Sequence, residues 1–230
     1  MSTCSMSSRA TELRLALTVC LALAVLFIAM PQIDLIVAGW FYRGNGQWVM
    51  NRQDIWLAIP YRGLPWLGQG LLIALAGLWL LGFSRHFPRL KAKRASLGFL
   101  LCGALAGPVL LVDATLKEHS GRTRPVNIEQ FGGSKQFSTA FIPADQCEQN
   151  CSFVSGHVAT AAYLMAFGWL GAPALRRRWL LASLASAAVF AVVRMVPGGH
   201  FLSDTIFAWF ATYFSLWLTE YIFRRLKWLP

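Results

Sequence analysis

Long apolar stretches alternate with short polar ones along almost the whole chain, and this pattern predicts a bundle of membrane-spanning helices. At 1.5 Å of rise per residue, six stretches are long enough to cross a hydrocarbon core about 30 Å thick. We expect one helix from each of residues 13–30, 64–83, 96–115, 154–171, 179–196 and 201–223. The predicted fold class is therefore an all-α integral membrane bundle of six transmembrane helices, forming one domain over residues 1–230.

Two longer polar segments interrupt this pattern. Residues 31–62 are rich in Gly, Trp and Tyr, which favours a loop or short helices at a membrane interface. Residues 116–153 form the longest polar stretch and are expected to lie outside the membrane. The first apolar run follows Arg9 and Arg14, and we interpret it as a retained helix because no small-residue cleavage site follows it.

The composition supports a membrane protein and argues against nucleic-acid binding. Hydrophobic residues make up 56% of the 230 residues and charged residues only 13%, well below the usual charged share. A net charge of +11 would suggest nucleic acid in a soluble chain. Here no basic groove with interleaved aromatics is visible, so we expect no nucleic-acid partner.

The basic residues are distributed unevenly between the two predicted faces. Six crossings place both chain ends on one side, which receives thirteen basic residues: Arg9, Arg14, Arg85, Arg89, Lys91, Lys93, Arg94, Arg176, Arg177, Arg178, Arg224, Arg225 and Lys227. The other side receives seven, with Arg194 at its edge: Arg43, Arg52, Arg62, Lys117, Arg122, Arg124 and Lys135. Because Lys and Arg are enriched in cytoplasmic loops, we predict that both termini are cytoplasmic.

Ionisable and polar side chains gather at the outer ends of the last four predicted helices. Charged groups at the edge of the hydrocarbon are costly and mark candidate functional sites. Chance would scatter such groups over both faces of the membrane, yet one face receives Lys117, Arg124, Ser155, Gly156, His157, Arg194, His200 and Asp204. We therefore expect a single site at this face.

The side chains in this set suit phosphoryl transfer. Asp204 lies one helical turn after His200, so its carboxylate can hold one ring nitrogen and leave the other as a base or nucleophile. A second histidine, His157, can protonate a leaving oxygen. Three cations can surround a phosphate, and a helix start at Ser155 can add backbone N–H groups. Zinc on the two histidines is the alternative, but the surrounding cations would repel it.

Three short motifs carry a resemblance to a known family. In order, they are Lys117-x6-Arg124-Pro125, Ser155-Gly156-His157 and Arg194-x5-His200-x3-Asp204, and they resemble the signature motifs of the type 2 phosphatidic acid phosphatase superfamily. These motifs lie between residues 117 and 204. Within the superfamily the chain looks most like the bacterial lipid A phosphatases, in its Gly-Arg-x-Arg-Pro run at 121–125 and its Gly-Gly-His-Phe-Leu-Ser-Asp run at 198–204.

The resemblance implies a role for each site residue. His200 would be the nucleophile that forms a phosphohistidine, Asp204 would orient it, and His157 would be the acid for the leaving group. The phosphate cradle would consist of Lys117, Arg124, Ser155, Gly156 and Arg194, and no metal or other cofactor is expected. The chain departs from the family pattern at two positions, with Val154 where Pro is frequent and Val193 where Ser is frequent.

These observations predict a metal-independent phosphatase that removes a phosphate from a membrane lipid at the periplasmic face of a bacterial inner membrane, with lipid A favoured. Polyprenyl diphosphate and phosphatidylglycerophosphate are alternative substrates, and a second lipid could replace water as the acceptor. The alternative outside enzymes is an anion or proton-coupled transporter. It is disfavoured because the charges cluster at one face and are not strung through the midplane.

The partners of three further side chains remain open at the level of the sequence. Cys147 and Cys151 lie in the predicted periplasmic loop, where an oxidising environment favours a local disulfide. Asp113 lies near the end of the third predicted helix. It either pairs with an arginine of the site or stabilises a helix contact.

Overall fold

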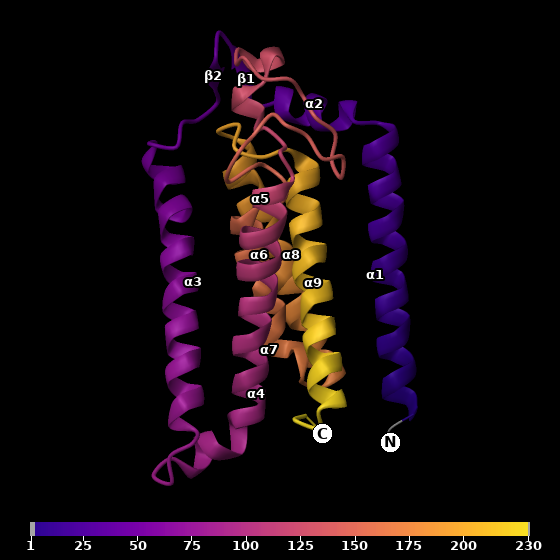
Figure 1. Cartoon of the computed structure of the whole chain (residues 1–230), viewed down its shortest axis with the longest axis vertical. Helices are drawn as coiled ribbons and strands as arrows, with labels where there is room; N and C mark the ends of the chain where they lie inside the picture. The colour runs from indigo at the N-terminus through magenta and orange to yellow at the C-terminus, as the bar shows by residue number, and fades with distance from the viewer. Residues whose placement is uncertain (1–2, 230) are drawn as a thin grey trace.

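A bundle of long helices, closed at one end by loops and a small hairpin, makes up the protein (Figure 1). The computed structural model describes the backbone of residues 3–229 and the side chains of residues 9–229. Both ends of the described chain lie at the end of the bundle opposite the hairpin. The long helices are α1 (Thr3–Ala29), α3 (Ile55–Leu81), α4 (Pro88–Ala104), α8 (Pro173–Met195) and α9 (Leu202–Arg225).

Four helices among the described residues are long and apolar enough to cross a membrane, namely Arg9–Ala29, Ile55–Leu81, Pro88–His119 and Pro173–Met195. The prediction of a mainly helical, multi-pass membrane protein is confirmed at this level. In the most apolar stretches of the first two, only 6% of the residues are buried. Their apolar side chains therefore face outward, as expected of helices that contact lipid.

The third predicted span is longer than the apolar run suggested. Its α-helix begins with Pro88 in the first turn, where a missing N–H costs nothing. It continues through the π-helical stretch Leu105–Leu116 into α5 (Lys117–His119). Pro108 lies inside this stretch and cannot donate a backbone hydrogen bond, and such interruptions accompany wider helical turns.

The fourth and sixth predicted spans lie inside the bundle (Figure 1). Residues 154–171 form α6 (Gly156–Ala162), a 3-10 turn (Tyr163–Met165) and α7 (Ala166–Trp169), not one continuous α-helix. α9 is continuous, but it carries Thr212, Ser215, Thr219 and Glu220 among its buried residues. Both segments pack against other helices, so their polarity and breaks are shielded from lipid.

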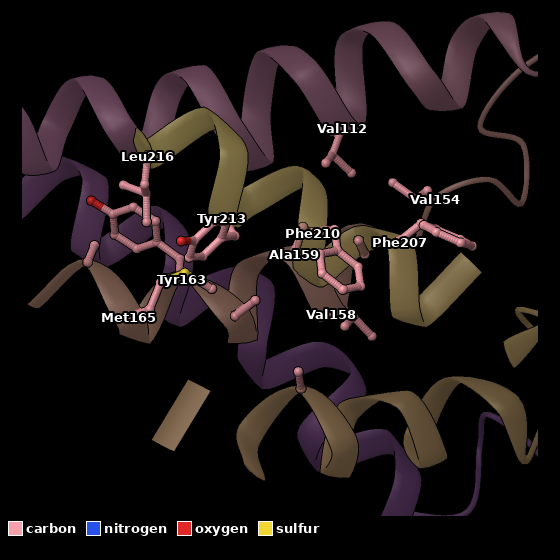
Figure 2. Packing of buried hydrophobic residues seen from close by; sticks show 14 of the residues in the cluster. Val112, Val154, Val158, Ala159, Tyr163, Met165, Phe207, Phe210, Tyr213 and Leu216 are labelled. Atoms are coloured by element: carbon pink, nitrogen blue, oxygen red, sulfur yellow. The ribbon is translucent and has the colours of Figure 1, made fainter. Parts of the chain in front are cut away.

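The core of the bundle is aromatic and aliphatic, and it lies between α6, α7, α9 and the third span (Figure 2). Trp169 and Tyr213 pack edge to face with ring centroids 5.3 Å apart. Leu216 and Val158 are almost completely buried. A close-packed core of this kind fixes the positions of the helix ends from which the polar side chains project.

The aromatic segment between the first two long helices contains α2 (Gln32–Gly39) and a two-stranded hairpin, β1 (Tyr42–Gly44) and β2 (Gln47–Trp48). Its turn has positive φ at Gly44, Asn45 and Gly46, the conformation that Gly and Asn adopt most readily. Both elements lie at the loop end of the bundle in Figure 1.

Candidate active site

His200 lies in the short connection between α8 and α9, and its side chain is almost completely buried. Its Nδ1 is 2.8 Å from the backbone oxygen of Ser152. A carbonyl can only accept, so Nδ1 carries the hydrogen and Nε2 is the nitrogen with a free lone pair. Burial lowers the pKa of His200 to about 3, and the nearby arginines Arg194 and Arg124 act in the same direction against Asp204. The imidazole is therefore neutral near pH 7.

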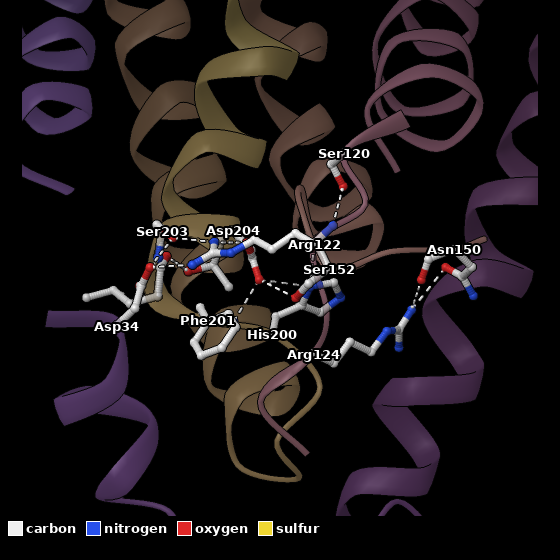
Figure 3. A network of polar contacts seen from close by, with 12 residues as sticks. Asp34, Ser120, Arg122, Arg124, Asn150, Ser152, His200, Phe201, Ser203 and Asp204 are labelled. Atoms are coloured by element: carbon white, nitrogen blue, oxygen red, sulfur yellow. Dashed lines mark hydrogen bonds and ion pairs between the residues drawn. The ribbon is translucent and has the colours of Figure 1, made fainter. Parts of the chain in front are cut away.

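Asp204 lies in the first turn of α9, behind the imidazole of His200 (Figure 3). Its Oδ2 accepts hydrogen bonds from Ser152 Oγ at 2.5 Å and from the Phe201 N–H at 2.8 Å. The distance from Oδ2 to His200 Nδ1 is 3.6 Å. The closest acceptor for the imidazole is therefore the Ser152 carbonyl, and Asp204 lies beside this hydrogen bond.

The connection between α8 and α9 contains two glycines at which the chain passes very close to other groups. Gly198 has φ of +64°, and a Cβ there would lie 2.5 Å from the indole ring of Trp48. A Cβ on Gly199 would lie 3.3 Å from Nη2 of Arg194. The loop therefore fits between the hairpin and the guanidinium of Arg194, and this fixes the position of His200.

Ser155 and Arg194 carry polar atoms without partners. Ser155 is fully buried before the start of α6, and its N–H donates to the backbone oxygen of Asp204 at 3.0 Å. Arg194, at the end of α8, is 2% exposed. Within the described part of the chain, Ser155 Oγ and the Nε and Nη1 atoms of Arg194 are buried and have no hydrogen-bond partner. An open guanidinium edge and a hydroxyl are the groups that bind a phosphate oxygen.

His157, in the first turn of α6, is held by α3. Its Nε2 is 2.8 Å from the backbone oxygen of Tyr61, and its ring centroid is 5.0 Å from that of Tyr61. The ring of Tyr61 also lies 4.4 Å from Cζ of Arg194. Tyr61 therefore contacts two predicted site residues. Nothing in the sequence distinguishes Tyr61 from the other aromatic residues of the segment 31–62.

The two remaining cations are already engaged. Lys117 Nζ is 3.1 Å from Oδ1 of Asp113, so Asp113 pairs with a lysine and not with an arginine of the site. A Cβ on Gly156 would lie 2.5 Å from the same carboxylate, so only glycine fits there without displacement. Arg124 donates to the backbone oxygen and to Oδ1 of Asn150 at 2.7 and 3.0 Å. Burial and the charge of Arg52 lower the pKa of Arg124.

Two cavities reach this group from different directions. One, of about 300 Å³, lies between α3, the π-helical stretch and α6, and its mostly apolar wall ends at Lys117, Gly156 and His157. The other, of about 580 Å³, lies above the bundle and is lined by Arg52, Arg124 and several amide side chains. The first cavity therefore borders Lys117, Gly156 and His157 of the predicted site, and the second borders Arg124.

Some structural features of the site could not be seen in the motifs. Arg122 and Asp34 form a buried ion pair at 2.8 Å, and Ser152 supports both His200 and Asp204. The position of Arg122 inside the first motif was the one available signal. Cys147 and Cys151 are joined by a disulfide in the loop above the site. Among the residues with described side chains, no three His, Cys, Asp or Glu residues lie close enough to hold a metal ion.

The apolar helices and the polar groups at one end of the bundle agree with the family that a comparison with known proteins identifies. The model of the PAP2 superfamily matches residues 96–228, and the chain belongs to this superfamily. The predicted resemblance to type 2 phosphatidic acid phosphatases is thus confirmed, as is the enzyme class, a phosphoric monoester hydrolase.

Curated relatives extend the similarity over nearly the whole chain. The chain is 33% identical over 220 residues to the lipid A 4'-phosphatase of Francisella tularensis subsp. novicida, covering 93% of this chain and 96% of that protein. It is 33% identical over 204 residues to the lipid A 4'-phosphatase of Rhizobium leguminosarum, covering 83% and 87%. No solved structure matches the chain.

Proposed function

We propose that this protein removes the 4'-phosphate of lipid A at the periplasmic face of a bacterial inner membrane. The relatives named above are lipid A 4'-phosphatases, and they are similar to this chain over most of its length. The single observation that carries the proposal is the set of open donors on Ser155 and Arg194 beside the neutral imidazole of His200. Each buried polar group without a partner costs about 1–3 kcal/mol, and a bound phosphate would supply the missing acceptors.

In the proposed reaction, Nε2 of His200 attacks phosphorus and forms an N–P bond while the bond from phosphorus to the lipid oxygen breaks. His157 gives a proton to that oxygen, and the dephosphorylated lipid leaves. Water then attacks the phosphohistidine, with His157 taking a proton from it, and inorganic phosphate is released. Arg194, Ser155 and the N–H of Gly156 at the start of α6 stabilise the phosphate oxygens in both steps.

Lys117 and Arg124 complete the proposed phosphate-binding site when each leaves its present partner and binds the phosphate. Lys117 is paired with Asp113, and Arg124 with Asn150, before the substrate arrives. A phosphate dianion offers Arg124 a stronger charge-assisted hydrogen bond than the Asn150 amide does, and it offers Lys117 a more highly charged partner than the Asp113 carboxylate. We therefore expect both side chains to turn toward the phosphate on binding, while Arg194 is already in place.

We further propose that the chain crosses the inner membrane six times, with α6–α7 and α9 as the two inner crossings and both termini in the cytoplasm. This topology is supported by the common end of the bundle at which both chain ends lie and by the thirteen-to-seven excess of basic residues there. A reporter fused after residue 230 or within 85–94 should be cytoplasmic, and one within 134–149 periplasmic. A periplasmic C-terminus would overturn the topology.

Lateral entry of the lipid follows from the cavity between α3 and α6. Its mostly apolar wall, which includes Leu64, Leu71 and Leu72, leads to Gly156 and His157. A lipid phosphate can reach the site while its acyl chains stay in the bilayer, and each buried CH₂ contributes about 0.8 kcal/mol. We therefore expect a much higher kcat/KM for the lipid than for a soluble sugar phosphate. Equal values for both substrates would exclude lateral entry without excluding phosphatase activity.

Phosphate release by the purified protein tests the proposed substrate. The panel consists of lipid A, its separate 1- and 4'-monophosphates, polyprenyl diphosphate, phosphatidylglycerophosphate and phosphatidic acid, each with and without EDTA. The expected result is fastest release from the 4' position, unchanged by EDTA. Faster release from another lipid of the panel would make that lipid the substrate. Transfer of the phosphate to a second lipid would make the enzyme a phosphotransferase. Transport of phosphate without hydrolysis of any lipid would contradict the proposed reaction.

A further inference from the structure

A buried ion-pair network lies directly behind His200, and the reaction described above makes no use of it (Figure 3). Arg122 Nη1 donates to Asp204 Oδ1 at 2.5 Å, and Arg122 Nη2 donates to Asp34 Oδ2 at 2.8 Å. The three side chains are at most 1% exposed. Charged side chains are rarely buried to this degree without a specific role.

The guanidinium of Arg122 is fixed by partners on every nitrogen. Besides its two carboxylates, it donates from Nε to the backbone oxygen of Ser138 at 2.9 Å and from Nη1 to Ser203 Oγ at 2.8 Å. Its Cζ lies 4.5 Å from the ring centroid of Phe201, the residue after His200. A planar fork held in this way has one orientation, which a flexible ammonium group could not reproduce.

Asp34 connects α2 to the first turn of α9. Its Oδ1 accepts the backbone N–H of Ser203 at 2.9 Å, and its Oδ2 accepts Ser203 Oγ at 2.6 Å as well as Arg122. Ser203 directly precedes Asp204. Asp34 thus holds both the residue before the catalytic carboxylate and the arginine that binds this carboxylate.

Together these contacts leave the Asp204 carboxylate no freedom to rotate. Arg122 holds Oδ1, while Ser152 Oγ and the Phe201 N–H hold Oδ2, which is the oxygen that faces His200 Nδ1. Without Arg122, Oδ1 loses its charged partner and the carboxylate can rotate about the contacts on Oδ2. The guanidinium therefore completes the set of contacts that keeps the two oxygens distinct.

We propose that Arg122 and Asp34 are positioning residues that fix the Asp204 carboxylate behind His200, so that α2 belongs to the catalytic apparatus. This inference rests on the proposed function only for the identity of His200 as the attacking group. Neither residue touches the phosphate; Arg122 acts through Asp204, and Asp34 acts through Arg122 and Ser203. The N-terminal segment that contains α1 and α2 would then be needed for catalysis itself, in addition to anchoring the chain.

The competing explanation is that the network only ties α1 and α2 to the bundle. The opposite end of the bundle supplies a matched control, because Arg176 on α8 binds Glu12 on α1 through two hydrogen bonds of 2.8 and 2.9 Å. Glu12→Gln weakens this tie without touching the site. If anchoring of α1 were all that mattered, Glu12→Gln and Asp34→Asn should lower activity alike.

Charge decides which variants are informative. Arg122 lies between two carboxylates, so Arg122→Gln alone would bury two uncompensated negative charges and could prevent folding. The double variant Asp34→Asn/Arg122→Gln keeps the net charge of the wild-type trio, one negative. Arg122→Lys keeps the positive charge but loses the fork. The double variant and Arg122→Lys, together with Asp34→Asn and Glu12→Gln, separate folding from positioning.

The experiment measures kcat, KM and the pH profile on the lipid phosphate that the wild type hydrolyses fastest, together with the folded fraction by size-exclusion chromatography in detergent. For Arg122→Lys, Asp34→Asn and the double variant, kcat should fall about 10- to 100-fold with KM nearly unchanged, as for a misplaced catalytic group. Glu12→Gln should retain wild-type kcat per folded molecule. The double variant loses one cation and one anion, so its pH profile should keep the acid limb of the wild type while kcat falls.

Wild-type kcat per folded molecule in the double variant and Arg122→Lys would overturn the inference, as would an equal loss in Glu12→Gln. A shifted acid limb in a folded double variant would show that the network acts through its charge and would contradict positioning. A wild-type protein without activity on any lipid phosphate would instead contradict the proposed function, so the two failures are distinguishable.

Discussion

At the end of the bundle where the chain ends lie, Glu220 accepts a hydrogen bond from Trp169 Nε1 at 2.7 Å, and Glu12 accepts hydrogen bonds from Arg176 and Tyr213. Every buried polar atom of this network has a partner in the described structure. At the other end the guanidinium and carboxylate atoms of the Arg122 network also have partners. Ser155 and Arg194 beside it carry buried polar atoms that have no hydrogen-bond partner in the described structure.

The buried side-chain polar atoms without partners that the described structure contains belong to four residues, Trp48, Ser138, Ser155 and Arg194, and all four lie at the His200 end. A network that only joins helices can satisfy itself, because the helices can pack until each donor finds an acceptor. A site that binds a charged ligand must keep donors open for it, and this lowers the stability of the empty protein. The two ends thus differ in their open hydrogen-bond donors, although both contain ion pairs.

The largest expected effect comes from removing the nucleophile. His200→Ala should reduce turnover to the background rate, because no other side chain can form the covalent intermediate. The measurement is phosphate release from lipid A by the purified variant. A matched change at the closed end, Tyr213→Phe, removes one hydrogen bond to Glu12 and should leave turnover unchanged. Residual turnover in His200→Ala within tenfold of the wild type would show that another group attacks.

Removal of the proposed acid should have a smaller and substrate-dependent effect. His157→Ala should slow turnover by a factor on the order of 10²–10⁴, the usual contribution of a general acid. A substrate with a very good leaving group does not need the proton, so it should recover part of the His157 loss and none of the His200 loss. Equal recovery in both variants would mean that the two roles are assigned wrongly.

Arg194→Gln and Arg176→Gln sharpen the contrast between the two ends. Arg194→Gln should lower kcat/KM by a factor of about 10²–10³, the effect of losing an oxyanion donor, while the melting temperature without ligand stays the same or rises. Arg176→Gln removes the ion-pair partner of Glu12, which keeps its hydrogen bond from Tyr213, so we expect a loss of about 1–2 kcal/mol in stability with normal kcat. Thermal unfolding and kinetics on the same samples measure both, and a less stable Arg194→Gln protein would remove the distinction.

The smallest expected effect is the pH dependence of stability due to His200. Its pKa is about 3 in the folded protein and 6.5 in a solvated histidine. Between these values the unfolded chain binds a proton that the folded chain does not, so stability falls as the pH decreases below 6.5. The slope is at most about 1.4 kcal/mol per pH unit. His200→Asn should remove it, and an identical slope in both proteins between about pH 5 and 6.5 would exclude the neutral buried imidazole.

How far the sequence could predict the molecule differs between fold and site. The apolar runs predicted the long helices, because hydrophobicity and length are local properties. They could not distinguish a lipid-facing helix from a buried one, so residues 154–171 were expected as one continuous helix and instead form α6, a 3-10 turn and α7. Packing inside the bundle, which no local pattern records, decides this.

For the site, the sequence identified the groups but not all of their partners. The four-residue spacing of His200 and Asp204 predicted a direct contact, whereas the Ser152 carbonyl is the nearer partner of the imidazole. Arg122 and Asp34 are 88 residues apart, and only the tertiary fold brings them together. Partners supplied by loops, such as Ser152, carry no periodicity from which they could be predicted.

Trapping of the phosphoenzyme tests the central claim most directly. Lipid A labelled with ³²P at the 4' position is mixed with the protein and quenched in alkali, in which a phosphohistidine survives and an acyl phosphate does not. We predict label on the peptide that contains His200, in the wild type and in His157→Ala but not in His200→Ala. Label on any other residue, or rapid phosphate release without labelled protein under conditions that trap a known phosphohistidine, would contradict the account.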